Sequence, residues 1–307
     1  MKVLITGTTG MVGRNLTEAF KSKFELIPNS RASLNLENYP QTFEFIKMNR
    51  PDLVIHAAGY VGGIQKNIQE IAKFYFVNTT VGFNLLNACN EVGVSRVINL
   101  GSSCMYPSHL SEEISEGQLS FENIEKTNEG YGLAKVAVAK FGTLLNQQGN
   151  FHRFKTIVPC NLFGKYDKFD SVRAHLIAAI IRKTYEAVTI GNESVEIWGD
   201  GTARREFMDV TDFANTILNL ADRFEELPEV LNVGLGYDFS VNEFYQMIAK
   251  QLQFNGTYIH DLMKPTGTRR KLLNISKLKE LGGLVDSGIE QNIKKAISYY
   301  KETLSLV

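Results

Sequence analysis

The chain has 307 residues, of which 44% are hydrophobic and 21% charged, as expected for a globular protein with one large core or two domains. Lys plus Arg and Asp plus Glu both number 33, so no overall field favours nucleic acid or an acidic membrane surface as a partner. No apolar run approaches the about 20 residues of a membrane helix, and we expect no secretory signal at the start. Three cysteines without C-x-x-C spacing argue against a disulfide framework or a metal site, which predicts the reducing cytoplasm.

The chain opens with an apolar run, residues 2–6, which leads into a glycine-rich turn and then a helical pattern through Phe20. Strand, glycine turn and helix in this order are typical of the first unit of a dinucleotide-binding fold. Glycines let the backbone approach a pyrophosphate, and the helix N-terminus supplies unpaired N–H groups. We therefore predict a nicotinamide cofactor at this turn, whose residues are Gly7, Gly10, Met11, Val12 and Gly13.

The second strand, expected at residues 24–27, is followed by Pro-Asn-Ser-Arg31. Proteins that prefer NAD carry an acidic residue here, which binds the ribose 2′-hydroxyl. In this chain the first carboxylate after the strand is Glu37, and the Arg31 guanidinium is suited to a 2′-phosphate. The pattern favours NADP over NAD.

Residues 52–59 read as a buried parallel strand that ends in small residues, including Ala57 and Ala58. Small residues at a strand end are suited to a backbone that passes close to a ligand, so we add Ala57 and Ala58 to the predicted cofactor site. We interpret His56, just before them, as a structural or cofactor-lining residue rather than a catalytic one.

The next predicted strand, residues 95–100, delivers Ser102 at its carboxyl end, where ligands bind in open α/β sheets. Further on, Tyr131-Gly-Leu-Ala-Lys135 places a Tyr and a Lys one turn apart on the same helix face. An ammonium nearby favours the phenolate and lowers the Tyr pKa, which suits Tyr131 to proton transfer near neutrality. Ser102 could hydrogen-bond a substrate carbonyl and hold it in line for that proton.

Beyond the strand expected at residues 156–160, the alternation of strands and helices breaks down. We predict an α/β protein whose core is a Rossmann-type doubly wound parallel sheet, with a smaller, discontinuous substrate lobe. The sheet domain is assigned to residues 1–165 and 207–235. The substrate lobe is assigned to residues 166–206 and 236–307, which include a helix expected around residues 174–187 and a basic cluster at residues 264–271.

Together these motifs resemble the extended short-chain dehydrogenase/reductase family, over essentially the whole chain, and within it the GDP-L-fucose synthase branch. The closer match is carried by G-M-V-G, G-S-S-C-M-Y-P, Y-G-L-A-K, N-L-F-G-K-Y-D-K-F-D and K-P-T-G-T-R-R-K-L-L. Members of this branch use NADPH to reduce a GDP-4-keto-6-deoxy-hexose after epimerising it at C3 and C5. The resemblance also implies a homodimer.

By this resemblance, Tyr131 is the acid that protonates the C4 oxygen, Lys135 binds the nicotinamide ribose, and Ser102 orients the ketone. The same resemblance assigns epimerisation to Cys104 and His175. The chemistry is reasonable because protons next to a ketone are acidified by enolate formation, so one group can remove a proton and another can return it from the opposite face.

A sugar nucleotide brings a diphosphate, and the resemblance implies that Arg205 and Lys271 contact it. The other predicted substrate-binding residues are Asn161, Lys183, at a position usually held by Arg, and Trp198, which by the resemblance lies near the nucleotide. Two segments depart from the branch pattern. Gly164-Lys165 stands where the branch has Gly-Pro, and the loop at residues 108–126 reads differently. Both segments belong where the sugar binds, so the sugar stays open between a 6-deoxy-hexose and a heptose.

Three alternatives remain open. The chain could be a reductase only, with epimerisation left to a separate enzyme. It could be an NAD-dependent nucleotide-sugar epimerase or dehydratase, although a dehydratase usually has an acidic residue after the strand-end hydroxyl, where this chain has Ser103 and Cys104. It could also be a non-catalytic cofactor-binding protein, against which the intact Ser102, Tyr131 and Lys135 argue.

Overall fold

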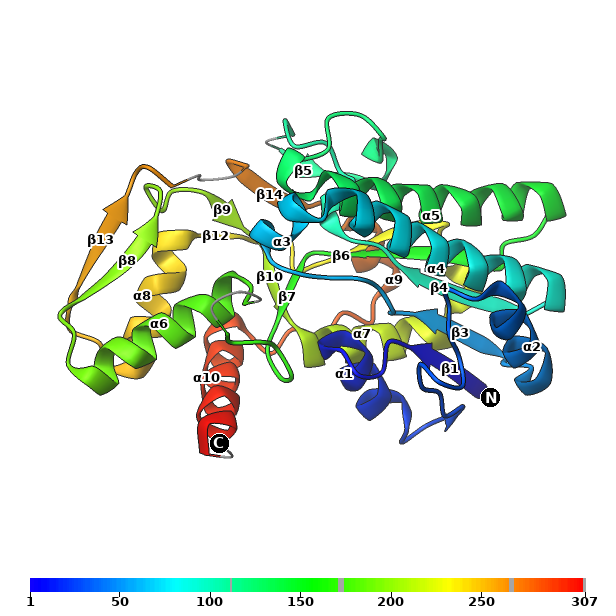
Figure 1. Cartoon of the computed structure of the whole chain (residues 1–307), viewed down its shortest axis with the longest axis horizontal. Coiled ribbons are helices and arrows are strands. Elements are labelled where there is room, and N and C mark those ends of the chain that lie inside the picture. Colours follow the sequence, from blue (N-terminus) through cyan, green and yellow to red (C-terminus); the bar gives the residue numbers. More distant parts are fainter. Residues whose placement is uncertain (111, 171–173, 265–267, 306–307) are drawn as a thin grey trace.

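A parallel sheet of six strands forms the centre of the larger part of the molecule (Figure 1). The computed structural model describes residues 1–110, 112–170, 174–264 and 268–305. The strands lie in the order β11-β6-β4-β3-β1-β2, and every neighbouring pair is parallel. The predicted Rossmann-type sheet is therefore confirmed, and its strands are β1 (Lys2–Thr6), β2 (Glu25–Leu26), β3 (Leu53–His56), β4 (Arg96–Leu100), β6 (Phe154–Pro159) and β11 (Val230–Val233).

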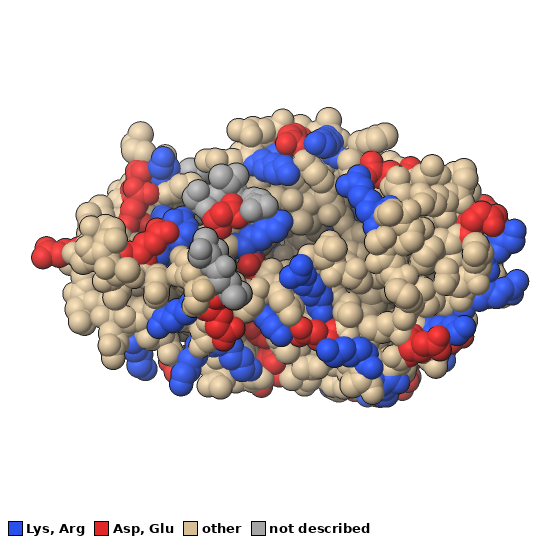
Figure 2. Space-filling view, turned by 60° about the horizontal axis from the view of Figure 1, so that its bottom comes forward, with Lys and Arg blue, Asp and Glu red and all other residues tan. Residues whose placement is uncertain are grey.

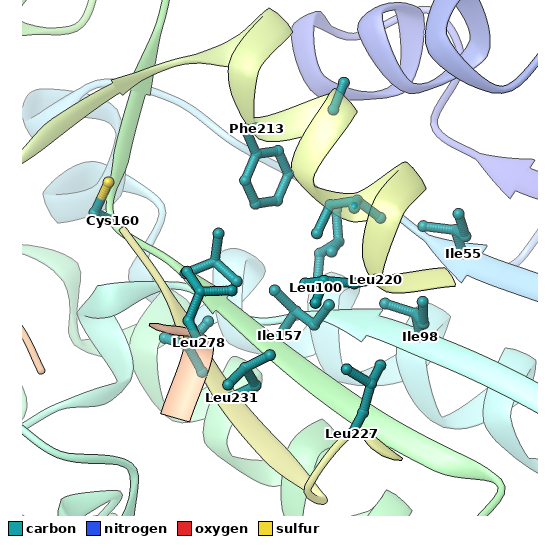
Figure 3. Packing of buried hydrophobic residues seen from close by; sticks show 14 of the residues in the cluster. Ile55, Ile98, Leu100, Ile157, Cys160, Phe213, Leu220, Leu227, Leu231 and Leu278 are labelled. Carbon is teal, nitrogen blue, oxygen red and sulfur yellow. The ribbon is translucent and has the colours of Figure 1, made fainter. Parts of the chain in front are cut away.

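Helices cover both faces of this sheet (Figure 1). Helices α1 (Met11–Phe20) and α7 (Val210–Asp222) pack on one face, and α2 (Tyr39–Asn49), α4 (Ile71–Val92) and α5 (Glu129–Gly149) pack on the other. Figure 3 shows the first of these cores, where Phe213 and Leu220 of α7 meet Ile98 and Ile157 of the sheet. The strands are nearly continuous apolar runs because they are buried on both faces.

The order of the strands creates a switch point. Strand β1 lies between β2 and β3, so the chain leaves β1 to one side and returns on the other. In such sheets the crevice for a ligand opens beyond the carboxyl ends of the strands on either side of the switch. Here those ends are at Thr6 and His56, next to the predicted glycine turn and the small residues Ala57 and Ala58.

The remaining elements form smaller sheets and the helices of the second lobe (Figure 1). Strand β14 lies between β9 and β5, β12 pairs with β9, β13 pairs with β8, and β10 pairs with β7. A separate apolar core lies under α6, α8 and α10. The bounds are β5 (Glu113–Ile114), β7 (Asn161–Phe163), β8 (Ser194–Trp198), β9 (Arg204–Arg205), β10 (Phe207–Asp209), β12 (Phe239–Ser240), β13 (Thr257–Asp261), β14 (Arg270–Leu273), α3 (Ile64–Gln69), α6 (Leu176–Ile190), α8 (Val241–Leu252), α9 (Ser276–Leu281) and α10 (Ile289–Ser305).

Local sequence signals account for several of the helix ends. Asp209 caps α7 by accepting hydrogen bonds from the N–H groups of Thr211 and Asp212, and α4 ends at Gly93 with a φ of 80°. The expected start of α6 at residue 174 shifts to Leu176, after His175 in extended conformation. Within the described ranges, no helix has the length and apolarity needed to cross a membrane.

Candidate active site

The glycine turn after β1 is packed backbone against backbone. Gly7 has a φ of 74°, and a Cβ atom added there would lie 2.7 Å from the carbonyl oxygen of Ala57. A Cβ atom on Gly13 would lie 2.1 Å from the carbonyl oxygen of Gly7. Helix α1 begins directly after Gly10, and no side chain caps its first N–H groups. The turn therefore fits a dinucleotide pyrophosphate, because it offers close backbone approach and a free helix N-terminus.

A buried histidine joins the ends of β1 and β3. The Nδ1 atom of His56 lies 3.0 Å from the hydroxyl oxygen of Thr6, which also accepts a hydrogen bond of 3.1 Å from the N–H of Ala58. Burial, together with the nearby ammonium of Lys135, lowers the pKa of His56 to about 3. His56 is therefore neutral, and it holds the strand ends in place.

Arg31, the candidate for a cofactor 2′-phosphate, projects from the segment after β2 with its side chain 84% exposed. Its guanidinium donates a hydrogen bond of 2.7 Å to Glu37. Glu37, the first carboxylate after the strand, therefore pairs with Arg31, and both side chains lie on the surface.

Ser102, Tyr131 and Lys135 come together at the carboxyl end of β4. Ser102 follows the strand and caps a short 3₁₀ helix, η1 (Ser103–Met105), by accepting a hydrogen bond of 3.2 Å from the N–H of Cys104. The Ser102 hydroxyl interacts with the Tyr131 hydroxyl. One turn further along α5, the ammonium of Lys135 donates 2.8 Å to the carbonyl oxygen of Leu100 and lies 5.7 Å from the centre of the Tyr131 ring.

Burial dominates the acid–base properties of this group. It raises the pKa of Tyr131, with a further contribution from Cys104, against the lowering effect of the Ser102 hydrogen bond. Burial also lowers the pKa of Lys135 to about 8. The expected lowering of the Tyr131 pKa by Lys135 does not appear in the ligand-free chain, because desolvation disfavours the phenolate. Tyr131 is accordingly a neutral phenol and a proton donor at neutral pH.

Cys104 reaches this group because a glycine makes room for it. A Cβ atom on Gly132 would lie 2.5 Å from the carbonyl oxygen of Cys104, so η1 can press against α5 only with glycine at this position. The Cys104 side chain is partly exposed. Cys89 and Cys160 are buried, and burial raises the pKa of both thiols, in agreement with a packing role.

Two predicted diphosphate ligands lie side by side on neighbouring strands. Strand β14 runs parallel to β9 in a register that pairs Lys271 with Arg205. Burial lowers the pKa of the Arg205 guanidinium, which interacts electrostatically with Glu125 and Cys104. The Lys271 ammonium lies 3.4 Å from the Glu125 carboxylate. Asn161, on β7, donates 2.9 Å to the carbonyl oxygen of Glu206.

Lys183 and Trp198 form a second group in the smaller lobe. The Lys183 ammonium lies 5.6 Å from the Trp198 ring and donates to the carbonyl of Glu196, and the Lys264 ammonium lies 5.5 Å from the same ring. Trp198 is 46% exposed, so its ring is open to a ligand. Figure 2 shows Lys and Arg side chains around a hollow in the middle of one face of the molecule. Residues 265–267 of the predicted basic cluster lie outside the described residues.

His175 stands apart from these groups. It is the residue before α6, with an exposed side chain that interacts electrostatically with the Asp167 carboxylate. Within the described part of the chain, no hydrogen bond or ion pair joins it to Ser102, Cys104 or Tyr131.

Two acidic residues at the site escaped the sequence analysis. Glu206 is 1% exposed, and its carboxylate accepts hydrogen bonds from the backbone N–H groups of Leu235, Gly236 and Leu273. Glu206 lies between β9 and β10, directly after Arg204 and Arg205, and this charged stretch of sequence gave no signal of its burial. Glu125 lies in the loop at residues 108–126, whose composition carries no such signal either.

The glycine turn, the switch point and the Ser-Tyr-Lys group define a dinucleotide-dependent enzyme of the short-chain dehydrogenase/reductase type. The model of the NAD dependent epimerase/dehydratase family matches residues 3–234, and the chain belongs to this family.

Similar proteins narrow the comparison. The chain is 42% identical to a GDP-L-colitose synthase of Yersinia pseudotuberculosis over 98% of both chains. It is 41% identical to a GDP-L-fucose synthase of Azorhizobium caulinodans, over 97% of this chain and 96% of that protein. The solved structure of a GDP-mannoheptose C4 reductase from Campylobacter jejuni with NADP bound is 26% identical, covers 98% of each chain and superposes with a TM-score of 0.88.

Proposed function

We propose that this protein is an NADPH-dependent reductase of the C4 ketone of a GDP-linked 4-keto sugar. The proposal rests mainly on the group of side chains at the end of β4. There the Ser102 hydroxyl contacts a neutral Tyr131 phenol, one helical turn from Lys135. Full-length similarity to GDP-L-fucose and GDP-L-colitose synthases, and to an NADP-bound C4 reductase, supports NADP and a GDP-sugar. We assign the sugar nucleotide to the lobe of residues 166–206 and 236–307.

When bound, the reduced nicotinamide supplies the hydride for C4. In this proposal Ser102 orients the ketone, and Tyr131 donates its proton to the C4 oxygen as the oxygen gains negative charge. The Lys135 ammonium, which lies 5.7 Å from the centre of the Tyr131 ring, offsets the charge that forms on the phenolate. Gly7, Gly13 and the start of α1 would hold the pyrophosphate, and Arg31 would meet the 2′-phosphate.

Epimerisation at C3 and C5 is the second part of the proposal. Cys104 lies beside Tyr131, so a thiol borders the position assigned to the ketone. We assign removal and return of the proton next to the ketone to Cys104 and His175, acting on opposite faces of the sugar. A reductase that lacks the epimerase activity remains the alternative.

One reaction tests both parts: purified protein, NADPH and GDP-4-keto-6-deoxy-mannose in D₂O, with the product analysed by NMR. A fucose-configured product with deuterium at C3 and C5 would support both activities, whereas reduction without deuterium would support the reductase alone. Tyr131→Phe should lose most of the reduction but keep NADPH binding. Near-normal turnover by this variant would refute the assignment. If this sugar does not react, the 4-keto heptose is the next substrate to test.

The quaternary structure is a further part of the proposal. Apolar side chains are exposed along the outer faces of α4 and α5, with Phe76 65%, Phe83 36% and Leu144 48% exposed. A second copy packed on this face would bury them as a homodimer. Sedimentation should show a dimer that Phe76→Glu dissociates. Phe121→Glu, at a residue that is 54% exposed in the loop before α5, is the control.

A further inference from the structure

The Glu125 carboxylate lies at the predicted diphosphate site with acceptor capacity to spare. One oxygen accepts a hydrogen bond of 3.2 Å from the Thr127 hydroxyl, and the other lies 3.4 Å from the Lys271 ammonium. The side chain of Glu125 is 20% exposed and that of Lys271 10%. A carboxylate can accept about four hydrogen bonds, so about two directions remain for a ligand.

The neighbours of Glu125 follow one another in a definite order. Lys271 and Arg205 are cross-strand partners, and Glu125 contacts the first and interacts electrostatically with the second. Arg205 in turn interacts with Cys104, which interacts with Tyr131. Glu125 therefore lies at the cation end of this row, beside Lys271 and Arg205, and Arg205 links that end to Cys104 and Tyr131.

A hexose attached to a diphosphate can be placed along this row. If the phosphates meet Arg205 and Lys271, C1 of the sugar lies beside the cations. If the C4 ketone meets Tyr131, the ring edge from C2 to C3 runs past Glu125 and Cys104. The free acceptor positions of the Glu125 carboxylate require a hydrogen-bond donor. The C2 hydroxyl is the donor on the sugar ring next to C1, the carbon that carries the diphosphate.

We propose that Glu125 accepts a hydrogen bond from the C2 hydroxyl of the sugar and thereby selects nucleotide sugars that carry a hydroxyl at this carbon. The proposal rests on the function proposed above. An ion pair with Lys271 alone does not explain why Glu125 is here. A carboxylate beside a phosphate-binding lysine opposes the binding of the negatively charged diphosphate. A hydrogen bond to the sugar offsets that repulsion and adds selectivity.

The test pairs a variant with a substrate analogue. We would measure kcat/KM for GDP-4-keto-6-deoxy-mannose and for its 2-deoxy counterpart, with the natural chain, Glu125→Gln and Glu125→Ala. The natural chain should prefer the hydroxylated sugar by about 100-fold or more, because a site built to bind a hydroxyl strongly rejects an analogue that lacks it. In Glu125→Ala the preference should fall to within a few-fold, and in Glu125→Gln it should be intermediate. Glu122→Gln, at an exposed position in the same loop, should retain the full preference.

An unchanged preference in Glu125→Ala, with both rates lowered together, would overturn the proposal and leave Glu125 as a residue that only positions Lys271. A binding assay separates this failure from failure of the proposed reaction. Trp198 is the only tryptophan, so its fluorescence can report the binding of unreactive GDP-mannose and of its 2-deoxy analogue. Selective binding lost in Glu125→Ala would support the proposal even if no ketone were reduced. Equal binding of the two sugars by the natural chain would refute it.

Discussion

Lys135 should make the folded protein less stable, and its replacement by methionine tests this. The residue is 7% exposed, and its ammonium donates its hydrogen bond of 2.8 Å to a neutral carbonyl rather than a carboxylate. A pKa of about 8, in place of about 10.4 for a free lysine, corresponds to a cost of about 3 kcal/mol near pH 7. Loss of the hydrogen bond reduces this gain by about 1 kcal/mol. Lys135→Met should therefore be more stable by about 2 kcal/mol, or about 3 °C in Tm.

The pH dependence of this gain identifies its cause. Lys135 loses its proton near pH 8 in the folded chain and near pH 10 in the unfolded chain. Between these values the unfolded state binds more protons, so the natural chain gains stability as the pH rises, while Lys135→Met lacks this gain. Thermal denaturation without cofactor should show an advantage of Lys135→Met that is full at pH 7 and nearly gone at pH 10. The exposed Lys140 of the same helix provides the control variant Lys140→Met, and a pH-independent advantage, or none, would refute the reasoning.

Further predictions concern the cofactor region. Arg31→Ala should weaken NADPH binding by about tenfold or more and leave NADH binding unchanged, as titration with each cofactor would show, because a charge-assisted hydrogen bond is worth about 1.5–3 kcal/mol. Glu37→Gln removes the carboxylate that pairs with Arg31 and should tighten NADPH binding a few-fold; weaker binding would contradict the predicted role of Arg31. Gly13→Ala should lower the free energy of unfolding by about 1–3 kcal/mol and reduce cofactor affinity, since its new methyl group would overlap the carbonyl of Gly7. Unchanged denaturation and NADPH binding in this variant would show that the turn can relax.

The glycine turn and the parallel sheet could be predicted because their signals are local. A strand with continuous apolar residues, followed by Gly7 and Gly13, leaves few other structures open. The contacts of these glycines in the fold show why: both sit where a side chain would collide with backbone. The spacing of Tyr131 and Lys135 is equally local, since one helix fixes their separation.

The charges around the substrate site could not be predicted in this way. Glu125 meets Lys271 across a sequence separation of 146 residues, and only the register of β9 with β14 brings Arg205 beside them. The pKa of Tyr131 also escaped prediction, because it depends on how deeply the folded chain buries the phenol, and the i to i+4 spacing contains no information on burial.

Burial shifts the pKa values of three titratable side chains around the ligand-free site toward their uncharged forms. Tyr131 is a phenol and His56 is a neutral imidazole, while the pKa of Lys135, on the same helix as Tyr131, is about 8. Burial is the first cause in each case, so the site excludes water before any ligand enters. A water-poor site strengthens each electrostatic contact that a ligand makes there. The stability lost by burying Lys135 is therefore recovered only when ligand oxygens reach its ammonium, which links the cost of the fold to the reaction that we propose.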